Sequence, residues 1–397
     1  MPPKIALGPS PDFSNTEVAF RYKSNRELAR AHFVFRVVNN PFISSVATGL
    51  VKAAIALRLP VEWLLRETVF RHFVGGETIE NSEVTIDKLG RHGVRTILDY
   101  AVEGEKTESG FDLTCEQVLN TFTEAVASSN VPFCVFKVTG IGDAQLLERV
   151  QSGQALTDAE SAAFNRIRGR VQRICARAGE TGIPVLIDAE ETWIQDPIDA
   201  LAEEMMALYN RERTLVYTTI QFYRTDGIAR LSETLKRAEA GNYRLGIKAV
   251  RGAYMEKERQ RAIENGYPDP IQPDKASTDR DFNAAVQFCL QHRDRISLLC
   301  GSHNEESNRM LHELMVQEGL ASGDTHVWFS QLLGMSDNIS FNLAAAGYNV
   351  AKYVPFGPVR AVVPYLLRRA EENTSVAGQS SRELQLVRRE VARRKAS

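Results

Sequence analysis

Eight short segments rich in β-branched residues alternate with longer amphipathic segments through most of this chain of 397 residues. They lie near 94–101, 133–140, 183–190, 215–223, 244–252, 296–304, 325–334 and 349–357. Strands that alternate with helices form parallel sheets, and eight such units predict a closed barrel of ~250 residues. We therefore expect an α/β fold, a TIM-type (β/α)8 barrel with an N-terminal helical region.

The pattern divides the chain into three parts. Residues 1–83 are predicted to be a helical region, 84–375 the barrel, and 376–397 a basic helical tail. Two segments add to the simple repeat: a helical insertion at 151–179 and a proline-containing stretch at 266–278.

The composition is typical of a soluble globular protein, with 43% hydrophobic and 25% charged residues and a net charge of −2. This balance does not indicate a nucleic-acid partner. The five cysteines form no CxxC pair, which favours reduced thiols in a reducing compartment. We expect a cytoplasmic protein, since neither a signal peptide nor an Arg-rich transit peptide is seen.

The longest apolar stretch runs from 41 to 60 and contains Lys52 and Arg58. Its apolar residues recur at helical spacing, but the two charges leave it short of a clean span of ~20 apolar residues. We interpret it as an amphipathic helix that packs on the protein's own core. The alternative is a peripheral contact with the inner face of a membrane.

Polar residues stand at the end of most of the expected strands. In a barrel these ends meet at one face, where the active site lies. A single polar strand end is also explained by a solvated rim, but polar residues at six or seven strands favour a pocket. The residues are Lys137, Asp188, Glu190, Glu191, Gln221, Tyr223, Lys248, Arg251, Ser302, His303, Asn304, Gln331, Lys352 and Tyr353.

The motifs of metal and phosphate sites are missing from the sequence. Of the seven histidines, His303 alone lies at a strand end, so we expect no metal. The segment TGIGDAQ begins like a dinucleotide fingerprint, but Gln145 stands at its third glycine position. We interpret this segment as a loop.

Two cations, Lys248 and Arg251, interrupt the fifth apolar run in LGIKAVRGAYMEKE. A buried ammonium without a polar partner is costly, so a partner is expected.

The helix after the last strand has two different sides. Tyr365, Arg368, Arg369 and Glu372 share one side, and Leu366, Leu367 and Ala370 share the other. The first side is either a charged solvent face or a guanidinium pair for a carboxylate.

Long motifs that contain these residues resemble the proline dehydrogenase family. They are KAVRGAYMEKERQRA, GSHNEESNRML, FSQLLGMSDNISFNLAAAGYNVAKYVPFGPV and PYLLRRAEENTS. The resemblance implies a distorted (β/α)8 barrel that binds FAD non-covalently and oxidises L-proline to Δ1-pyrroline-5-carboxylate. It also implies that the electrons pass to a membrane quinone, in proline catabolism.

The resemblance further implies roles for individual residues. Asp188 resembles the family's catalytic aspartate, and Lys248 would act beside the flavin as a second catalytic residue. Arg368, Arg369 and Lys137 would hold the proline carboxylate, Tyr254, Tyr353 and Leu332 would line the ring, and Glu372 would pair with an arginine. Flavin contacts are implied for Gln221 and His303, and for the backbones of Ala189, Val250, Arg251, Gly252 and Ser302.

The resemblance offers a partner for the two cations of the fifth run, because reduced flavin carries negative charge. Lys248 and Arg251 would face that cofactor. Many bacterial members have arginine at position 248, whereas KAVRGAY follows the KLVRGAY of eukaryotic members. Lysine offers one compact donor in place of a bidentate fork, so the geometry at this position differs.

Two rival functions fit part of this pattern. Hydroxyproline dehydrogenase is a related enzyme with serine at the position of Tyr353, so Tyr353 favours proline. A flavin-free barrel that binds an amino acid without chemistry is the other rival. The full set of strand-end residues argues against this second rival. An absorption spectrum of the purified protein distinguishes a flavin enzyme from a flavin-free barrel.

Overall fold

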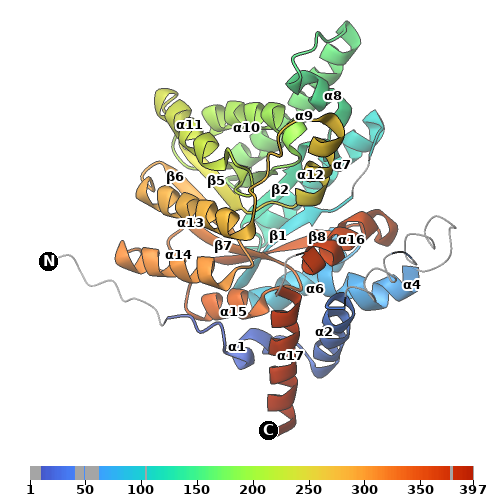
Figure 1. Cartoon of the computed structure of the whole chain (residues 1–397), viewed down its shortest axis with the longest axis vertical. Coiled ribbons are helices and arrows are strands. Elements are labelled where there is room, and N and C mark those ends of the chain that lie inside the picture. The colour runs from blue at the N-terminus through green and yellow to red at the C-terminus, as the bar shows by residue number, and fades with distance from the viewer. Residues whose placement is uncertain (1–9, 41–48, 50–61, 103–104, 376–378, 397) are drawn as a thin grey trace. The chain divides into compact units, whose positions relative to one another are not determined.

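The computed structural model describes residues 10–40, 49, 62–102, 105–375 and 379–396, without the side chains of 64 and 368–380 (Figure 1). The strands are β1 (Val94–Tyr100), β2 (Phe133–Lys137), β3 (Val185–Asp188), β4 (Val216–Gln221), β5 (Leu245–Val250), β6 (Ile296–Gly301), β7 (Val327–Leu332) and β8 (Val350–Phe356). Each lies inside a segment predicted as a strand, and together they follow one another in a closed barrel. The predicted (β/α)8 fold is confirmed.

The described residues form two compact units. The first includes Gly104–Ser330, and the second consists of Gly8–Glu103 with Gln331–Ser397. Helices of the first unit are α7 (Glu108–Ala127), α8 (Ala144–Gln151), α9 (Asp158–Thr181), α10 (Gln195–Tyr209), α11 (Gly227–Ala240), α12 (Met255–Asn265), α13 (Lys275–Gln291) and α14 (Glu305–Gln317). Helices of the second unit are α1 (Thr16–Phe20), α2 (Asn25–Val38), α4 (Glu62–Leu65), a π-helix (Arg66–Phe70), α5 (Arg71–Phe73), α6 (Ile79–Gly90), α15 (Asp337–Ala345), α16 (Val359–Ser375) and α17 (Gln379–Ala396).

In the first unit a parallel ladder aligns the carboxyl ends of the strands. All four residues of β3 are buried, as expected of a strand covered on both faces. The register pairs Lys137 of β2 with Asp188 of β3. It also pairs Lys248 of β5 with Thr219 of β4. The ladder therefore brings charged residues from separate strands to one edge.

Helix α9 takes up most of the predicted insertion. A capping box between Thr157 and Glu160 fixes its start. It ends at Gly182, whose φ of 73° is the left-handed conformation that glycine adopts without steric cost. The chain turns there and enters β3. Helices α10 and α11 lie side by side (Figure 1), where Arg237 of α11 donates a hydrogen bond to Glu203 of α10. Both helices pack against β4.

In the second unit, the C-terminal helix α17 lies beside α1 and α2 (Figure 1). Leu384, Leu386 and Val387 of α17 join a buried cluster with Phe20 and Phe35. The apolar stretch at 41–60, predicted to be an amphipathic helix, lies outside the described residues except for Gly49. Among the described residues, no helix is both long and apolar enough to cross a membrane.

A buried ionic cluster holds the turn after β7 in the second unit. Asp337 pairs with Lys23 at 2.9 Å and with Lys352 at 3.0 Å, and accepts a hydrogen bond from Tyr22 at 2.8 Å. Burial alone would raise the pKa of Asp337, but the two lysines hold it well below its ordinary value. The lysine side chains are 7% and 0% exposed, so this carboxylate is neutralised without water.

The same cluster corrects the expectation that Lys352 points into a pocket. Its Nζ donates to the main-chain oxygens of Leu332 at 3.3 Å and Met335 at 2.6 Å. Ser336, with a φ of 50°, adopts a left-handed conformation that is unfavourable for a residue other than glycine. Its N–H donates to the buried Glu383 of α17 at 2.5 Å. Lys352 and Glu383 therefore support this turn.

We predict that Asp337→Asn lowers the free energy of unfolding by about 3–5 kcal/mol, because it removes the carboxylate that pairs with the buried ammonium groups of Lys23 and Lys352. Urea denaturation measures this loss. The exposed pair of Lys236 and Glu233 is the control, where Glu233→Gln should cost no more than about 1 kcal/mol. Similar stabilities of the two variants would refute this account of the cluster.

Candidate active site

Asp188 lies between two lysines at the strand ends of the first unit. Its Oδ1 is 2.6 Å from Nζ of Lys248, and its Oδ2 is 3.2 Å from Nζ of Lys137. Burial alone would raise the pKa of Asp188, but Lys248 and Lys137 together lower it. The carboxylate therefore stays ionised at neutral pH. The Lys137 side chain is 24% exposed, against 9% for Lys248 and 10% for Asp188, so it is the most accessible of the three.

Glu190 follows two residues later and is buried. It accepts hydrogen bonds from the Thr139 N–H, at 3.0 Å, and from the Thr139 hydroxyl. Burial raises the pKa of Glu190 to about 7, although the bonds from Thr139 oppose the rise. The sequence placed Glu190 at a strand end but gave it no role. The sequence feature that could have indicated a role is the second carboxylate of LIDAEE, residues 186–191. The sequence does not identify Thr139 as its partner.

Arg251 is held by protein groups on all sides of its guanidinium. Its Nε donates to Asp279 at 2.7 Å, and its two terminal nitrogens donate to Ser302 and Ser307 at 2.8 Å each. The guanidinium also lies over the ring of Phe282, 4.3 Å from its centroid. These bonds tie the end of β5 to the helices and loop around β6.

The partners of Lys248 and Arg251 correct part of the sequence interpretation. A flavin was expected to supply the acceptor that these cations need, but each already has a carboxylate within the protein. An ammonium has three N–H donors, so Lys248 can still donate to a ligand while it holds Asp188. Its predicted place beside the cofactor does not depend on lacking a partner.

The predicted backbone contacts lie around the same strand ends. Val250 is the last residue of β5, and Ala189 directly follows β3. Gly252 has a φ of 135°, and a Cβ there would lie 2.4 Å from the ring of Tyr223, so a larger residue does not fit. Ser302 follows β6, and its N–H donates to Ser330 of β7 at 3.1 Å. His303 is half-buried next to it.

Two predicted substrate residues lie on adjacent elements of the second unit. Leu332 ends β7, and Tyr353 lies on β8 with 5% of its surface exposed. The N–H of Leu333 donates to the Tyr353 carbonyl at 2.9 Å. Tyr254, in the first unit, is half-buried at the start of α12.

Helix α16 carries the predicted arginine pair. The side chains of Arg368, Arg369 and Glu372 lie outside the described part of the structure. Tyr365 and Leu366 were assigned to opposite sides of this helix, but both are buried in one apolar cluster. The buried side is therefore broader than the sequence pattern indicated.

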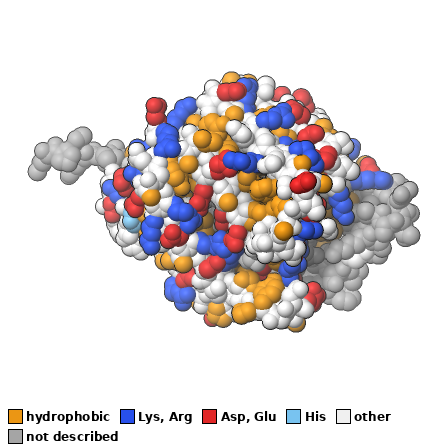
Figure 2. Space-filling model, turned by 90° about the horizontal axis from the view of Figure 1, so that it is seen from above, with side chains coloured by type: hydrophobic (Ala, Val, Ile, Leu, Met, Phe, Trp, Pro, Cys, Tyr) orange, Lys and Arg blue, Asp and Glu red, His pale blue; other side chains and the backbone are white. Residues whose placement is uncertain are grey.

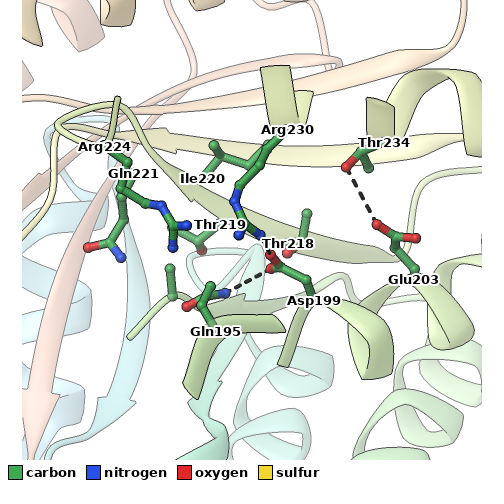
Figure 3. Close-up of a pocket in the computed structure, with 11 residues that line it drawn as sticks. Gln195, Asp199, Glu203, Thr218, Thr219, Ile220, Gln221, Arg224, Arg230 and Thr234 are labelled. Carbon is green, nitrogen blue, oxygen red and sulfur yellow. Dashed lines mark hydrogen bonds and ion pairs between the residues drawn. The ribbon is translucent and has the colours of Figure 1, made fainter. Parts of the chain in front are cut away.

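A polar cavity lies behind Gln221, between β4 and helices α10 and α11 (Figure 3). The space between its lining atoms totals about 380 Å³ with its open mouth, but only about 20 Å³ of this is accessible to water. Its lining residues are Ala189, Gln195, Asp199, Glu203, Thr218, Thr219, Ile220, Gln221, Arg224, Arg230 and Thr234. Among the described residues, Nη1 of Arg224 and Oγ1 of Thr218 are buried without hydrogen-bond partners. Sequence reasoning singled out Ala189 and Gln221 of this set and missed the polar residues on α10 and α11.

Comparison with known proteins identifies the family. The model of the family described as Proline dehydrogenase matches residues 82–382. The carbapenem antibiotics biosynthesis protein CarD of Pectobacterium carotovorum subsp. carotovorum is 38% identical over 81% of this chain and 83% of its own. Proline dehydrogenase 1, mitochondrial, of Dictyostelium discoideum is 30% identical over 96% of this chain and 74% of its own. Hydroxyproline dehydrogenase of Xenopus laevis is 32% identical over 94% of this chain and 88% of its own.

Solved structures agree on the fold. Proline utilization A (PutA) from Bdellovibrio bacteriovorus, inactivated by N-propargylglycine, aligns with a TM-score of 0.71 at 17% identity. The alignment covers 92% of this chain and 36% of that one, so this chain spans about a third of its length. PutA of Bradyrhizobium japonicum aligns with a TM-score of 0.65 at 22% identity and covers 79% of this chain. On the match over 82–382 and the identities over most of its length, the chain belongs to the proline dehydrogenase family.

Proposed function

We propose that this protein oxidises L-proline to Δ1-pyrroline-5-carboxylate with non-covalently bound FAD, and passes the electrons to a membrane quinone. Membership of the family supports a flavin enzyme of proline catabolism. The observation that carries the proposal is the buried Asp188 carboxylate between Lys137 and Lys248, at the strand ends where barrel enzymes place their chemistry.

The donor set fits a flavin. Lys248 in β5 and Arg251 directly after it bring two positive charges to one strand end, which suits a ring system that becomes electron-rich on reduction. Gly252 keeps the backbone at the end of β5 free of a side chain. We propose that the cofactor is held by Ala189, Gln221, Val250, Arg251, Gly252, Ser302 and His303.

When bound, FAD supplies the acceptor for the hydride that leaves the carbon next to the proline nitrogen. The protein orients donor and acceptor and places charge where it develops. Asp188 stays ionised, because Lys248 and Lys137 outweigh the effect of burial on its pKa. Its proposed catalytic role is therefore to hold both ammonium groups in position rather than to accept a proton. Lys248 stabilises negative charge near the cofactor.

Lys137 is suited to a substrate carboxylate, since its side chain is partly exposed while Asp188 fixes the position of its ammonium. We propose that Arg368 and Arg369 hold the same carboxylate and that Glu372 pairs with an arginine. Tyr254, Leu332 and Tyr353 are proposed to line the ring. Together these residues would select a cyclic amino acid.

The proposal extends to organisation and location. We assign residues 1–83 to a helical region, 84–375 to the catalytic barrel and 376–397 to a helical tail. A quinone acceptor requires access to a membrane, so we propose a peripheral contact at the inner face, on the matrix side in a eukaryote. A vesicle sedimentation assay tests this contact.

We predict that the purified protein is yellow, releases FAD on denaturation and reduces an electron-accepting dye with L-proline. Chromatography of the heat-released supernatant identifies the flavin, and the dye assay is run with trans-4-hydroxy-L-proline in parallel. Proline should have the higher kcat/KM. A protein that contains no flavin and gains no activity from added FAD would show that the proposal is wrong.

Lys248→Ala should slow anaerobic flavin reduction by about 10²-fold, by analogy with the loss of one preorganised donor. Proline binding should weaken less, because the stabilised charge grows during hydride transfer. Lys248→Arg keeps a cation and is the matched control. Stopped-flow spectroscopy measures the rates, and normal reduction by Lys248→Ala would leave this lysine a purely structural role.

Hydroxyproline dehydrogenase is the second candidate, since a relative of that name matches nearly the whole chain. Tyr353 favours proline, because its bulk would exclude the ring hydroxyl. Tyr353→Ser should therefore move the ratio of kcat/KM values toward hydroxyproline, by about a hundredfold at most. An unchanged ratio would show that Tyr353 does not line the ring.

A further inference from the structure

Two glutamines hold the backbone of Glu190, next to the end of β3. Oε1 of Gln195 accepts a hydrogen bond from the Glu190 N–H at 2.7 Å. Nε2 of Gln221 donates to the Glu190 carbonyl at 2.7 Å. Both glutamines are buried. Because Glu190 is two residues from Asp188, these bonds also restrict the position of the Asp188 backbone.

The side-chain amide of Gln195 points its oxygen toward Glu190, because the amide nitrogen is bonded to another residue. Nε2 donates to Oδ1 of Asp199 at 2.8 Å, one helical turn further along α10 (Figure 3). An ionised carboxylate accepts hydrogen bonds and cannot donate one. It therefore fixes the nitrogen end of the amide toward itself and leaves the oxygen for the Glu190 N–H.

Asp199 is itself held from the opposite side. Nη1 of Arg230 is 3.2 Å from its Oδ2, and Arg230 also pairs with Asp226 and Asp196. The charged groups around Asp199 are Arg224 from the turn after β4, Arg230 from α11, and Asp196 and Glu203 on its own helix. Burial raises the pKa of Asp199 to about 6, while Gln195, Arg230 and Arg224 oppose the rise.

We propose that Asp199 and Gln195 are positioning residues, which act through the backbone of Glu190 to hold Asp188 between its two lysines. Ionised Asp199 orients Gln195, Gln195 binds the Glu190 N–H, and the chain after β3 is fixed. The kinetic consequence rests on the proposed function, whereas the structural consequence does not.

Protonation of Asp199 weakens the constraint, because a carboxylic acid can donate a hydrogen bond as well as accept one. Its carboxylic acid can donate to Oε1 of Gln195, and the amide can then turn its NH2 group toward the Glu190 N–H. Two donors face each other in that arrangement, and the hydrogen bond to Glu190 is lost. The constraint is therefore present above about pH 6 and weakens as the pH falls through that value.

Exchanging the two functional groups tests the proposal. In Asp199→Asn, the asparagine can either donate or accept, so the orientation of Gln195 is no longer fixed. In Gln195→Glu, two carboxylates face each other. In the double variant Asp199→Asn/Gln195→Glu, the asparagine donates to the glutamate, whose other oxygen accepts from the Glu190 N–H. Glu203→Gln is the matched control, because Glu203 lies one turn further on α10 and lines the same cavity (Figure 3). Its ionic partner is Arg237, not Arg230.

Hydrogen exchange of the Glu190 amide is the first measurement, on the purified protein at one pH above 7, by mass spectrometry of overlapping peptides. We expect exchange about tenfold faster in each single variant and close to wild type in the double variant and in Glu203→Gln. If the single variants exchange like wild type, or the double variant fails to recover, the proposal is overturned. This outcome does not depend on which reaction the protein catalyses.

Anaerobic flavin reduction by proline is the second measurement. Asp199→Asn should reduce its flavin about tenfold more slowly at neutral pH, with recovery in the double variant. In the wild type, the rate of flavin reduction should decrease as the pH is lowered through about 6. This decrease should be absent from the pH profile of Asp199→Asn. The pKa of Glu190 is also close to neutral, at about 7. The part of the pH profile that disappears in Asp199→Asn is therefore the part that belongs to Asp199. An active wild type with an unchanged Asp199→Asn variant would overturn the positioning role, whereas an inactive wild type would count against the proposed function alone.

Discussion

The candidate site depends on the electrostatic balance around Asp188. A carboxylate taken out of water is costly unless it is paired and hydrogen-bonded. Lys248 and Lys137 supply both the pairing and the hydrogen bonds. Lys137 comes from β2, before Asp188 in the sequence, and Lys248 comes from β5, after it. The arrangement requires three strands whose ends are level, which the parallel register provides. The fold and the chemistry thus meet at one buried anion.

A carboxylate between two lysines occurs at two places in the protein, and the two clusters differ in their exposure to solvent. Asp337 also lies between two lysines, Lys23 and Lys352, but that cluster is sealed from solvent. At Asp188 the side chain of Lys137 remains partly exposed. The first arrangement suits stability, since nothing can reach its charges. The second leaves a cation accessible to an anionic substrate, and this difference separates a structural ion cluster from a candidate catalytic one.

Much of this architecture was predictable from local pattern. The β-branched runs located all eight strands, and the residues at their ends included Asp188, Lys248 and Lys137. The partners of these residues were not predictable, because they come from elements distant in the chain. Lys248 is 60 residues from Asp188, and Arg251 is 28 residues from Asp279. A cation inside an apolar run indicates that a partner exists, but periodicity does not say which carboxylate the fold brings to it. The same limit hid the buried role of Lys352 and the hydrogen bonds that connect Asp199 to Glu190.

The rate of anaerobic flavin reduction by L-proline in Asp188→Asn tests the central claim most directly. If ionised Asp188 holds the two ammonium groups for hydride transfer, the variant should keep its flavin and lose at least about 10²-fold in this rate. A folded, flavin-loaded Asp188→Asn variant that is reduced as fast as wild type would contradict the account.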